Sequence, residues 1–214
     1  MASKSTLLLA LSSAVLSVAI AVDKKEEPPL RVLLTLDGAK HTVALDSDFT
    51  FQIDGKERSG RVEVAPTRRF EHRGVSFEYP TDFAFESIPV PEREIFTLQG
   101  DNTLLILQYF EGTQDPAELT SSVTGTTEEQ YKELDYTREK VEAPFMGRVV
   151  EGQRLTVSMG TPPNGGKFRQ DFFGFPAEGT TLVVCLQANL KADDSEHAAA
   201  ELVRSLLQQS LRTP

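Results

Sequence analysis

The amino-acid sequence predicts an α+β protein with a mostly antiparallel β-sheet flanked by helices and preceded by a small antiparallel β unit. Segments with apolar residues at alternate positions recur along the chain, which is the pattern of strands with one buried face. Helical signals occur in only two places, over residues 116–134 and near the C-terminus. The resulting order of strands, helix, strands, helix is typical of an α+β protein and lacks the regular alternation of a doubly wound nucleotide-binding fold.

Residues 30–65 contain the first group of expected strands. The turn signals Asp37-Gly38 and Asp54-Gly55 separate short segments rich in branched or alternating apolar residues, and Asp-Gly between such segments indicates a hairpin. We expect a small antiparallel β subdomain here. Residues 66–73 are expected to form a connector, which is short for a linker that would let 30–65 act as a separate ligand-binding unit.

The main domain is predicted over residues 74–211. Asp115-Pro116 combines an N-cap residue with proline at the first helical position, and it predicts a helix over 116–134 that is broken or kinked near Gly125. Apolar residues at helical spacing predict a second helix near the C-terminus, with Asp193-x-x-Glu196 as its capping box. The remaining alternating segments predict strands over residues 74–80, 83–86, 94–98, 103–110, 137–141, 148–159, 167–175 and 180–189.

The segment Gly74-Val75-Ser76-Phe77-Glu78-Tyr79-Pro80, followed by Phe83, resembles the start of the Mog1/PsbP-like fold. In that group a strand ending in an aromatic-proline step introduces a sheet sandwiched by helices. The order of elements down to the last helix is also similar, so the resemblance covers residues 70–210. It implies an α/β/α sandwich and an accessory, assembly or binding role. It carries over no catalytic, cofactor-binding or metal-binding residues, so none is predicted.

Residues 1–21 have the three parts of a cleavable signal peptide: a positive start ending at Lys4, an apolar segment, and small residues at Ala19 and Ala21. The apolar segment is diluted by serines and shorter than the about 20 strongly apolar residues of a membrane span. We therefore expect cleavage after Ala21, followed by a charged, proline-containing leader over 22–29. An uncleaved anchor is the alternative. The short presequence favours a bacterial exported protein, periplasmic or extracellular, over the chloroplast branch of the group.

The composition limits the partners of the exported chain. The full sequence has a formal net charge of −10, and an acidic surface repels nucleic-acid phosphates and anionic lipid head groups. No cysteine lies directly after the apolar segment, so a lipid anchor is not expected. We predict a soluble protein with no stable membrane anchor after cleavage, no nucleic-acid partner, no cofactor and an interaction with another protein.

The sequence shows no motif of the common hydrolases. Its single cysteine, Cys185, lies in an apolar segment and is expected to be a buried structural thiol, with a nucleophilic or redox role as the alternative. The three histidines, His41, His72 and His197, are far apart, and both His-Glu-x-x-His and Gly-x-Ser-x-Gly are absent. We therefore predict a protein that is not an enzyme. The alternative is an exported hydrolase with an active site assembled from distant residues.

Two segments partly match ligand-binding motifs. Asp46-x-Asp48-x-Thr50 with Asp54 and Glu57 has the spacing of a calcium loop, but Phe51 occupies the place where that loop needs glycine. We expect a polar turn that leads into a strand. Residues 160–166 are glycine-rich but contain two prolines, which cannot donate N–H groups to a phosphate. A hairpin loop is the expected structure.

Two further sets of residues have alternative interpretations. A basic cluster around 58–73 is expected to be a solvated connector or, alternatively, a docking patch for an acidic partner. Apolar residues over 83–91 are expected in the core or, alternatively, in a groove that binds protein. The basic residues are Arg58, Arg61, Arg68, Arg69 and Arg73, and the apolar ones are Phe83, Phe85, Ile88, Pro89, Val90 and Pro91.

Overall fold

The computed structural model describes residues 32–36, 39–43, 52–53, 56–57, 61–91, 93–160 and 166–214. Side chains are described from Ala65 onward, apart from Pro89. The predicted signal peptide, the leader and most of the calcium-loop segment lie outside these residues. No helix in the described part of the chain has the length and apolar character needed to cross a bilayer.

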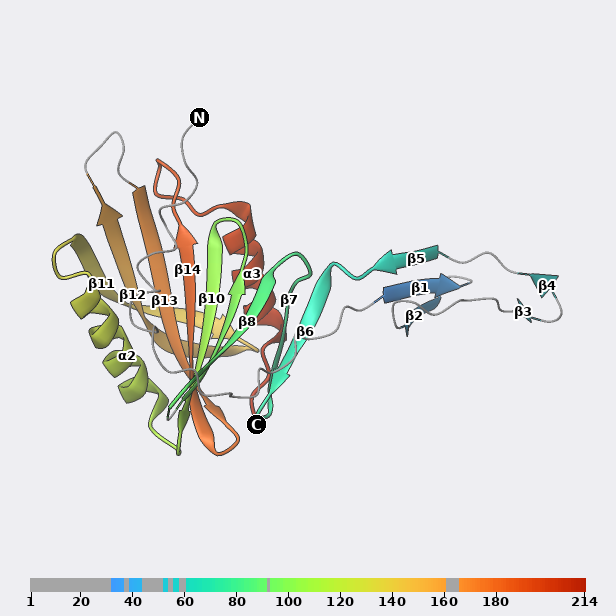
Figure 1. The fold of residues 1–214 in the computed structure, drawn as a ribbon, viewed down its shortest axis with the longest axis horizontal. Helices are drawn as coiled ribbons and strands as arrows, with labels where there is room; N and C mark the ends of the chain where they lie inside the picture. Colours follow the sequence, from blue (N-terminus) through green and yellow to red (C-terminus); the bar gives the residue numbers. More distant parts are fainter. Residues whose placement is uncertain are drawn as a thin grey trace.

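The main sheet is antiparallel throughout the part of the chain that the structure describes. Its strands are β8 (Ala84–Val90), β9 (Arg93–Gln99), β10 (Thr103–Glu111), β11 (Asp135–Phe145), β12 (Arg148–Met159), β13 (Gly166–Ala177) and β14 (Thr180–Asn189). They lie in the order β11-β12-β13-β14-β10-β9-β8 (Figure 1). Strands that are adjacent both in this order and in the sequence pair antiparallel, and β10 pairs with β14 across the centre.

Two helices cover opposite faces of the sheet (Figure 1). Leu119 of α2 (Pro116–Gln130) packs with Phe172 on one face. Val203 and Leu207 of α3 (Ala198–Ser210) pack with the core that contains Phe173 on the other. Consecutive residues of a strand point to opposite faces. Because a helix covers each face, the central strand β14 is buried at nearly every position, and its sequence does not alternate between apolar and polar residues. The predicted α+β class with helices on both faces is confirmed.

A second, smaller layer lies over the β8–β10 side of the sheet. It is the hairpin of β6 (Thr67–His72) and β7 (Val75–Pro80), joined by Arg73 and Gly74 at φ values of 47° and 72°. Positive φ at both turn residues defines the tight turn that matches strand twist. Residues 66–73 were predicted to be a connector, and that prediction is wrong for 67–72 because alternating Arg68 and Phe70 are buried against the core.

Near the N-terminus, three strands form a separate antiparallel sheet in the order β2-β1-β5. They are β1 (Val32–Leu36), β2 (Ala39–Val43) and β5 (Arg61–Val64), and a two-stranded hairpin of β3 (Gln52–Ile53) and β4 (Lys56–Glu57) precedes β5. Short antiparallel strands are present within the predicted unit. Its predicted boundaries as a subdomain remain a prediction.

The helix boundaries differ from two sequence predictions. The α2 helix begins at its predicted N-cap, Asp115, whose carboxylate accepts from two backbone N–H groups, but it continues through Gly125 without a break. The predicted capping box of α3 is also wrong. The helix begins at Ala198, while Asp193 accepts bonds from Ser195 and Glu196 pairs with arginine side chains.

Candidate functional site

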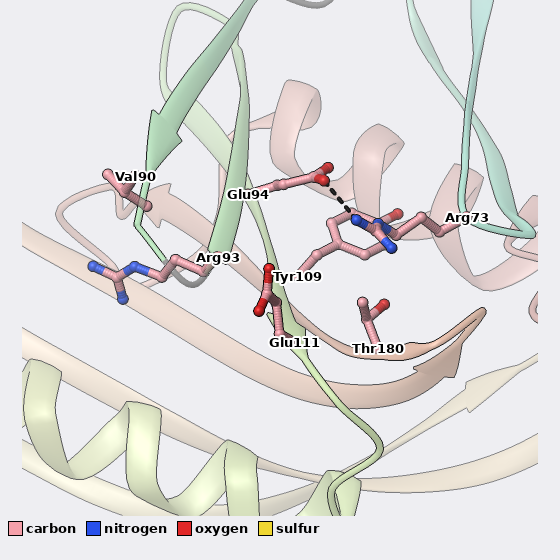
Figure 2. A pocket seen from close by; sticks show the side chains of 7 residues that line it. All are labelled: Arg73, Val90, Arg93, Glu94, Tyr109, Glu111 and Thr180. Carbon is pink, nitrogen blue, oxygen red and sulfur yellow. Dashed lines mark hydrogen bonds and ion pairs between the residues drawn. The ribbon is translucent and has the colours of Figure 1, made fainter. Parts of the chain in front are cut away.

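A small pocket lies where the β6–β7 turn meets the start of β9, the end of β10 and the start of β14. Its volume is about 100 Å³. The backbone N–H of Glu178, in the turn between β13 and β14, donates to the carbonyl of Arg73 at 3.0 Å and holds the two turns together. We call this site the hairpin pocket; it is lined by Arg73, Val90, Arg93, Glu94, Tyr109, Glu111 and Thr180 (Figure 2).

Strand register explains why these residues meet. Glu94 is directly opposite Tyr109 across β9 and β10, and Glu111 is directly opposite Thr180 across β10 and β14. Tyr109 and Glu111 are two positions apart on β10 and therefore share a face. The Arg93 side chain is directed away from this group (Figure 2), and its guanidinium donates to Gln108 at 3.4 Å.

Glu94 connects His72, the last residue of β6, with Arg73 in the turn that follows. Its Oε2 lies 2.5 Å from His72 Nε2, and its Oε1 accepts from an Arg73 guanidinium nitrogen at 2.7 Å. The His72 ring also contacts Tyr109 and Phe96 edge-on, with centroids 4.9 and 5.0 Å apart. The two aromatic rings fix the orientation of the imidazole, and the Glu94 carboxylate contacts its Nε2 atom.

Tyr109 forms the floor of the pocket and is almost fully buried. Burial raises the pKa of its phenol well above the ordinary value, and the nearby Glu94 carboxylate raises that pKa further against the opposing effect of Arg73. The phenol therefore stays neutral at physiological pH. Its O–H donates to the carbonyl of His72 at 3.4 Å, a long bond that leaves the hydroxyl available to a second partner.

Two buried polar atoms of the hairpin pocket have no hydrogen-bond partner in the described part of the chain. They are the Thr180 hydroxyl oxygen and the Nε of Arg73. The carboxylate of Glu111 likewise has no ion pair or side-chain hydrogen bond among the described residues, although it is exposed at the mouth. A buried polar group without a partner costs about 1–3 kcal/mol, so the Thr180 hydroxyl and Arg73 Nε mark a place that a hydrogen-bonding group from outside could fill.

A second hollow, of about 260 Å³, lies on the outer face of the β6–β7 hairpin beside the end of α3. Its polar groups are already satisfied within the chain. Arg69 donates to Ser76 at 3.1 Å, and Ser210 accepts from the Glu78 backbone at 2.8 Å. The larger hollow is therefore a weaker candidate than the hairpin pocket.

The structure places the sequence-predicted candidates as follows. Cys185 is buried beneath α2, as expected, and burial raises the pKa of its thiol, with Asp171 adding to the effect. His197 is the N-cap of α3. His41 lies in β2, and its side chain is outside the described residues. Among described residues, no group of three or more His, Cys, Asp or Glu is placed to hold a metal ion.

The basic cluster does not form one solvated patch among its described side chains. Arg68 is 9% exposed, Arg69 faces outward beside Glu71, and Arg73 lines the hairpin pocket. Phe83 is buried and packs in the core, as expected, with Phe85 partly buried against it. The glycine-rich segment 161–165 lies outside the described residues.

The hairpin pocket was not predicted from the sequence, because none of its residues forms a motif. One available signal was Arg73-Gly74 between two short alternating segments, with Phe70 and His72 before the turn and Val75 and Phe77 after it. That pattern is consistent with a two-residue hairpin. It would have placed His72 in a strand.

The sequence matches no protein-family model and no curated protein. Among solved structures, LpqN, involved in cell envelope biogenesis of Mycobacterium tuberculosis, is 16% identical, covers 65% of this chain and 83% of its own, and has a TM-score of 0.40. The Saccharomyces cerevisiae Ran-binding protein Mog1p is 12% identical, covers 67% of this chain and 91% of its own, and has a TM-score of 0.44. Both TM-scores lie below 0.5, so the Mog1/PsbP-like fold remains a prediction from the sequence. Both likenesses concern the fold alone, and neither protein's role is transferred.

Proposed function

We propose that this protein is an exported, non-catalytic binding protein that receives one side chain of a partner protein in the hairpin pocket. The observation that carries this proposal is the Thr180 hydroxyl. It is buried, has no partner among the described residues and points toward Arg73 and Tyr109 (Figure 2). Buried polar groups in native proteins are nearly always hydrogen-bonded, so an unpaired hydroxyl in a pocket wall indicates a group supplied from outside.

The size of the pocket supports a protein partner over a free metabolite. Sites for small molecules usually measure about 300–1,000 Å³, whereas this one measures about 100 Å³. That space fits the end of one side chain. Single residues buried in small, well-packed pockets often supply most of the binding energy of a protein interface. The net charge of −10 disfavours nucleic acid and anionic membranes as the partner.

A second candidate is an exported hydrolase that uses His72 as a general base. The 2.5 Å contact between His72 and Glu94 favours it, because a carboxylate that orients a histidine is a common catalytic arrangement. The described lining residues offer weak nucleophiles: the raised pKa of Tyr109 opposes ionisation, and Thr180 has no base within hydrogen-bond distance. We therefore favour the binding role.

A blocking variant separates the two functions. Val90 lines the pocket and is half-buried, so Val90→Phe should fill the pocket without removing a charge. The matched control is Val149→Phe, at a position that is 69% exposed and outside the pocket lining. A partner cross-linked to the wild type should be lost with Val90→Phe and kept with Val149→Phe. Equal recovery with both variants contradicts the binding role, and saturable ester or peptide hydrolysis that His72→Gln abolishes would support the hydrolase instead.

The export step has its own test. The small residues Ala19 and Ala21 predict a mature chain that begins at Val22 and carries no membrane anchor. N-terminal sequencing of the protein from the periplasmic or extracellular fraction should return Val22 as the first residue. Retention of residues 1–21 in a membrane fraction would instead support the uncleaved anchor.

A further inference from the structure

The unpaired groups of the hairpin pocket differ in what they require of a partner. The Nε–H of Arg73 is a donor and needs an acceptor. The carboxylate of Glu111 is an acceptor and needs a donor, while the Thr180 hydroxyl can serve as either. A side chain that satisfies all three must therefore present an acceptor and a donor together.

The charges of the pocket narrow this choice further. The Arg73 guanidinium is already paired with Glu94 at 2.7 Å, so the remaining unpaired charge among the described side chains that point into the pocket is that of Glu111. A carboxylate would bind Arg73 and Thr180 but would be repelled by Glu94 and Glu111. An ammonium group would bind Glu111 but would leave the Arg73 Nε–H unpaired and would lie beside a guanidinium.

A neutral carboxamide avoids both conflicts. Its oxygen has two lone pairs and can accept from Arg73 Nε–H and from the Thr180 hydroxyl, and its NH₂ can donate to Glu111. It brings no net charge next to the buried Tyr109 and Thr180 side chains, where an unpaired charge is costly. The burial of Thr180 and the exposure of Glu111 orient the carbonyl inward and the NH₂ toward the mouth.

We propose that the hairpin pocket recognises a carboxamide, the side-chain end of an asparagine or glutamine of the partner protein. This assignment rests on the proposed binding role of the pocket and adds the chemistry of the group that it accepts. The partner therefore presents an exposed Asn or Gln that enters between the Arg73-Gly74 turn and the end of β10.

Three probes of similar size test the assignment by NMR titration of the ¹⁵N-labelled mature protein: acetamide, acetate and ethylammonium. Acetamide should give saturable shifts of the backbone amides of Arg73, Glu111 and Thr180 and should bind at least tenfold more tightly than the other two. Tighter binding of acetate or ethylammonium at the same amides would overturn the carboxamide assignment and leave the binding role standing. No shift with any probe would also overturn the assignment, and the Val90→Phe capture experiment then decides the binding role separately.

Two variants test the role of each group. Thr180→Val removes the hydroxyl at nearly constant shape and should weaken acetamide binding at least tenfold, whereas Thr137→Val, at an exposed position of β11, should leave it unchanged. Glu111→Gln keeps a hydrogen-bonding oxygen but removes the repulsion, so acetate should gain at least fivefold while acetamide changes less than threefold. If Thr180→Val does not fold, the Glu111→Gln result decides, and unchanged discrimination against acetate overturns the proposal.

Discussion

The guanidinium of Arg154 binds both oxygens of the Asp171 carboxylate, directly across β12 and β13, at 2.6 and 3.0 Å. Asp171 is fully buried, and Arg204 of α3 donates to the same carboxylate at 2.6 Å. The bond with Asp171 raises the pKa of Arg154. Arg204 also reaches Glu196 at 2.5 Å. This cluster fastens α3 to the sheet through buried, charge-assisted hydrogen bonds.

Replacing Asp171 with asparagine should therefore destabilise the fold strongly. The change leaves two arginines beside a neutral group, and removal of one member of a buried ion pair typically costs about 3–5 kcal/mol. Urea unfolding followed by circular dichroism measures the change in the free energy of unfolding.

The control for this prediction is Lys167→Ala. Lys167 pairs with Asp194 at the surface, where the two side chains are 44% and 56% exposed, and such pairs contribute about 0–1 kcal/mol. If Asp171→Asn cost no more than Lys167→Ala, the cluster would have no special role in holding α3.

Gly174 should not tolerate a side chain, because α2 approaches β13 closely at this residue. A Cβ at Gly174 would lie 2.3 Å from the Pro116 carbonyl oxygen and 2.5 Å from the Thr120 hydroxyl. Gly174→Ala should therefore lower the free energy of unfolding by about 2–3 kcal/mol through overpacking. Gly166→Ala is the matched control on the same strand, because a Cβ there meets no atom within 4 Å. Equal stability of the two variants would show that α2 shifts without cost.

Elements specified by local signals could be predicted from the sequence. The bounds predicted for the strands 148–159 and 180–189 match β12 and β14, because alternating or continuous apolar residues fill each strand and turn residues end it. The Asp115 N-cap was correct for the same reason. The order of these elements was sufficient for the fold class.

The hairpin pocket could not be predicted, because it depends on strand register between distant segments. His72 and Glu94 are separated by 22 positions, yet their side chains meet. Glu196 shows the same limit: its spacing from Asp193 suggested a capping box, but its carboxylate pairs with Arg204 instead. A local pattern does not determine which tertiary partner a charged side chain will find.

Cys185 should be unreactive in the folded protein. The thiolate is the reactive form, and burial both excludes reagents and raises the pKa of the thiol. Reaction with DTNB at pH 8 should be at least tenfold slower in native buffer than in denaturing urea. Val149→Cys provides a control because that position is 69% exposed. The variant should show one fast-reacting thiol and one slow one. Rapid labelling of the wild type would instead support a nucleophilic role for Cys185.

Tyr109 should make the folded protein sensitive to alkaline pH. Burial raises the pKa of its phenol above the ordinary value of 10.0, so above pH 10 the unfolded chain releases a proton that the folded chain retains. The folded state then binds more protons, and the free energy of unfolding falls as pH rises, by about 1.4 kcal/mol per pH unit for one such group. Below pH 10 the phenol is protonated in both states, and this residue does not affect how the free energy of unfolding varies with pH.

Tyr109→Phe should therefore reduce the fall in the free energy of unfolding between pH 8 and pH 11, measured by urea unfolding. Its stability at pH 8 should change little, since the bond that is lost is 3.4 Å long. Parallel declines for the wild type and Tyr109→Phe would mean that the phenol ionises without unfolding and that the floor of the hairpin pocket is open to water.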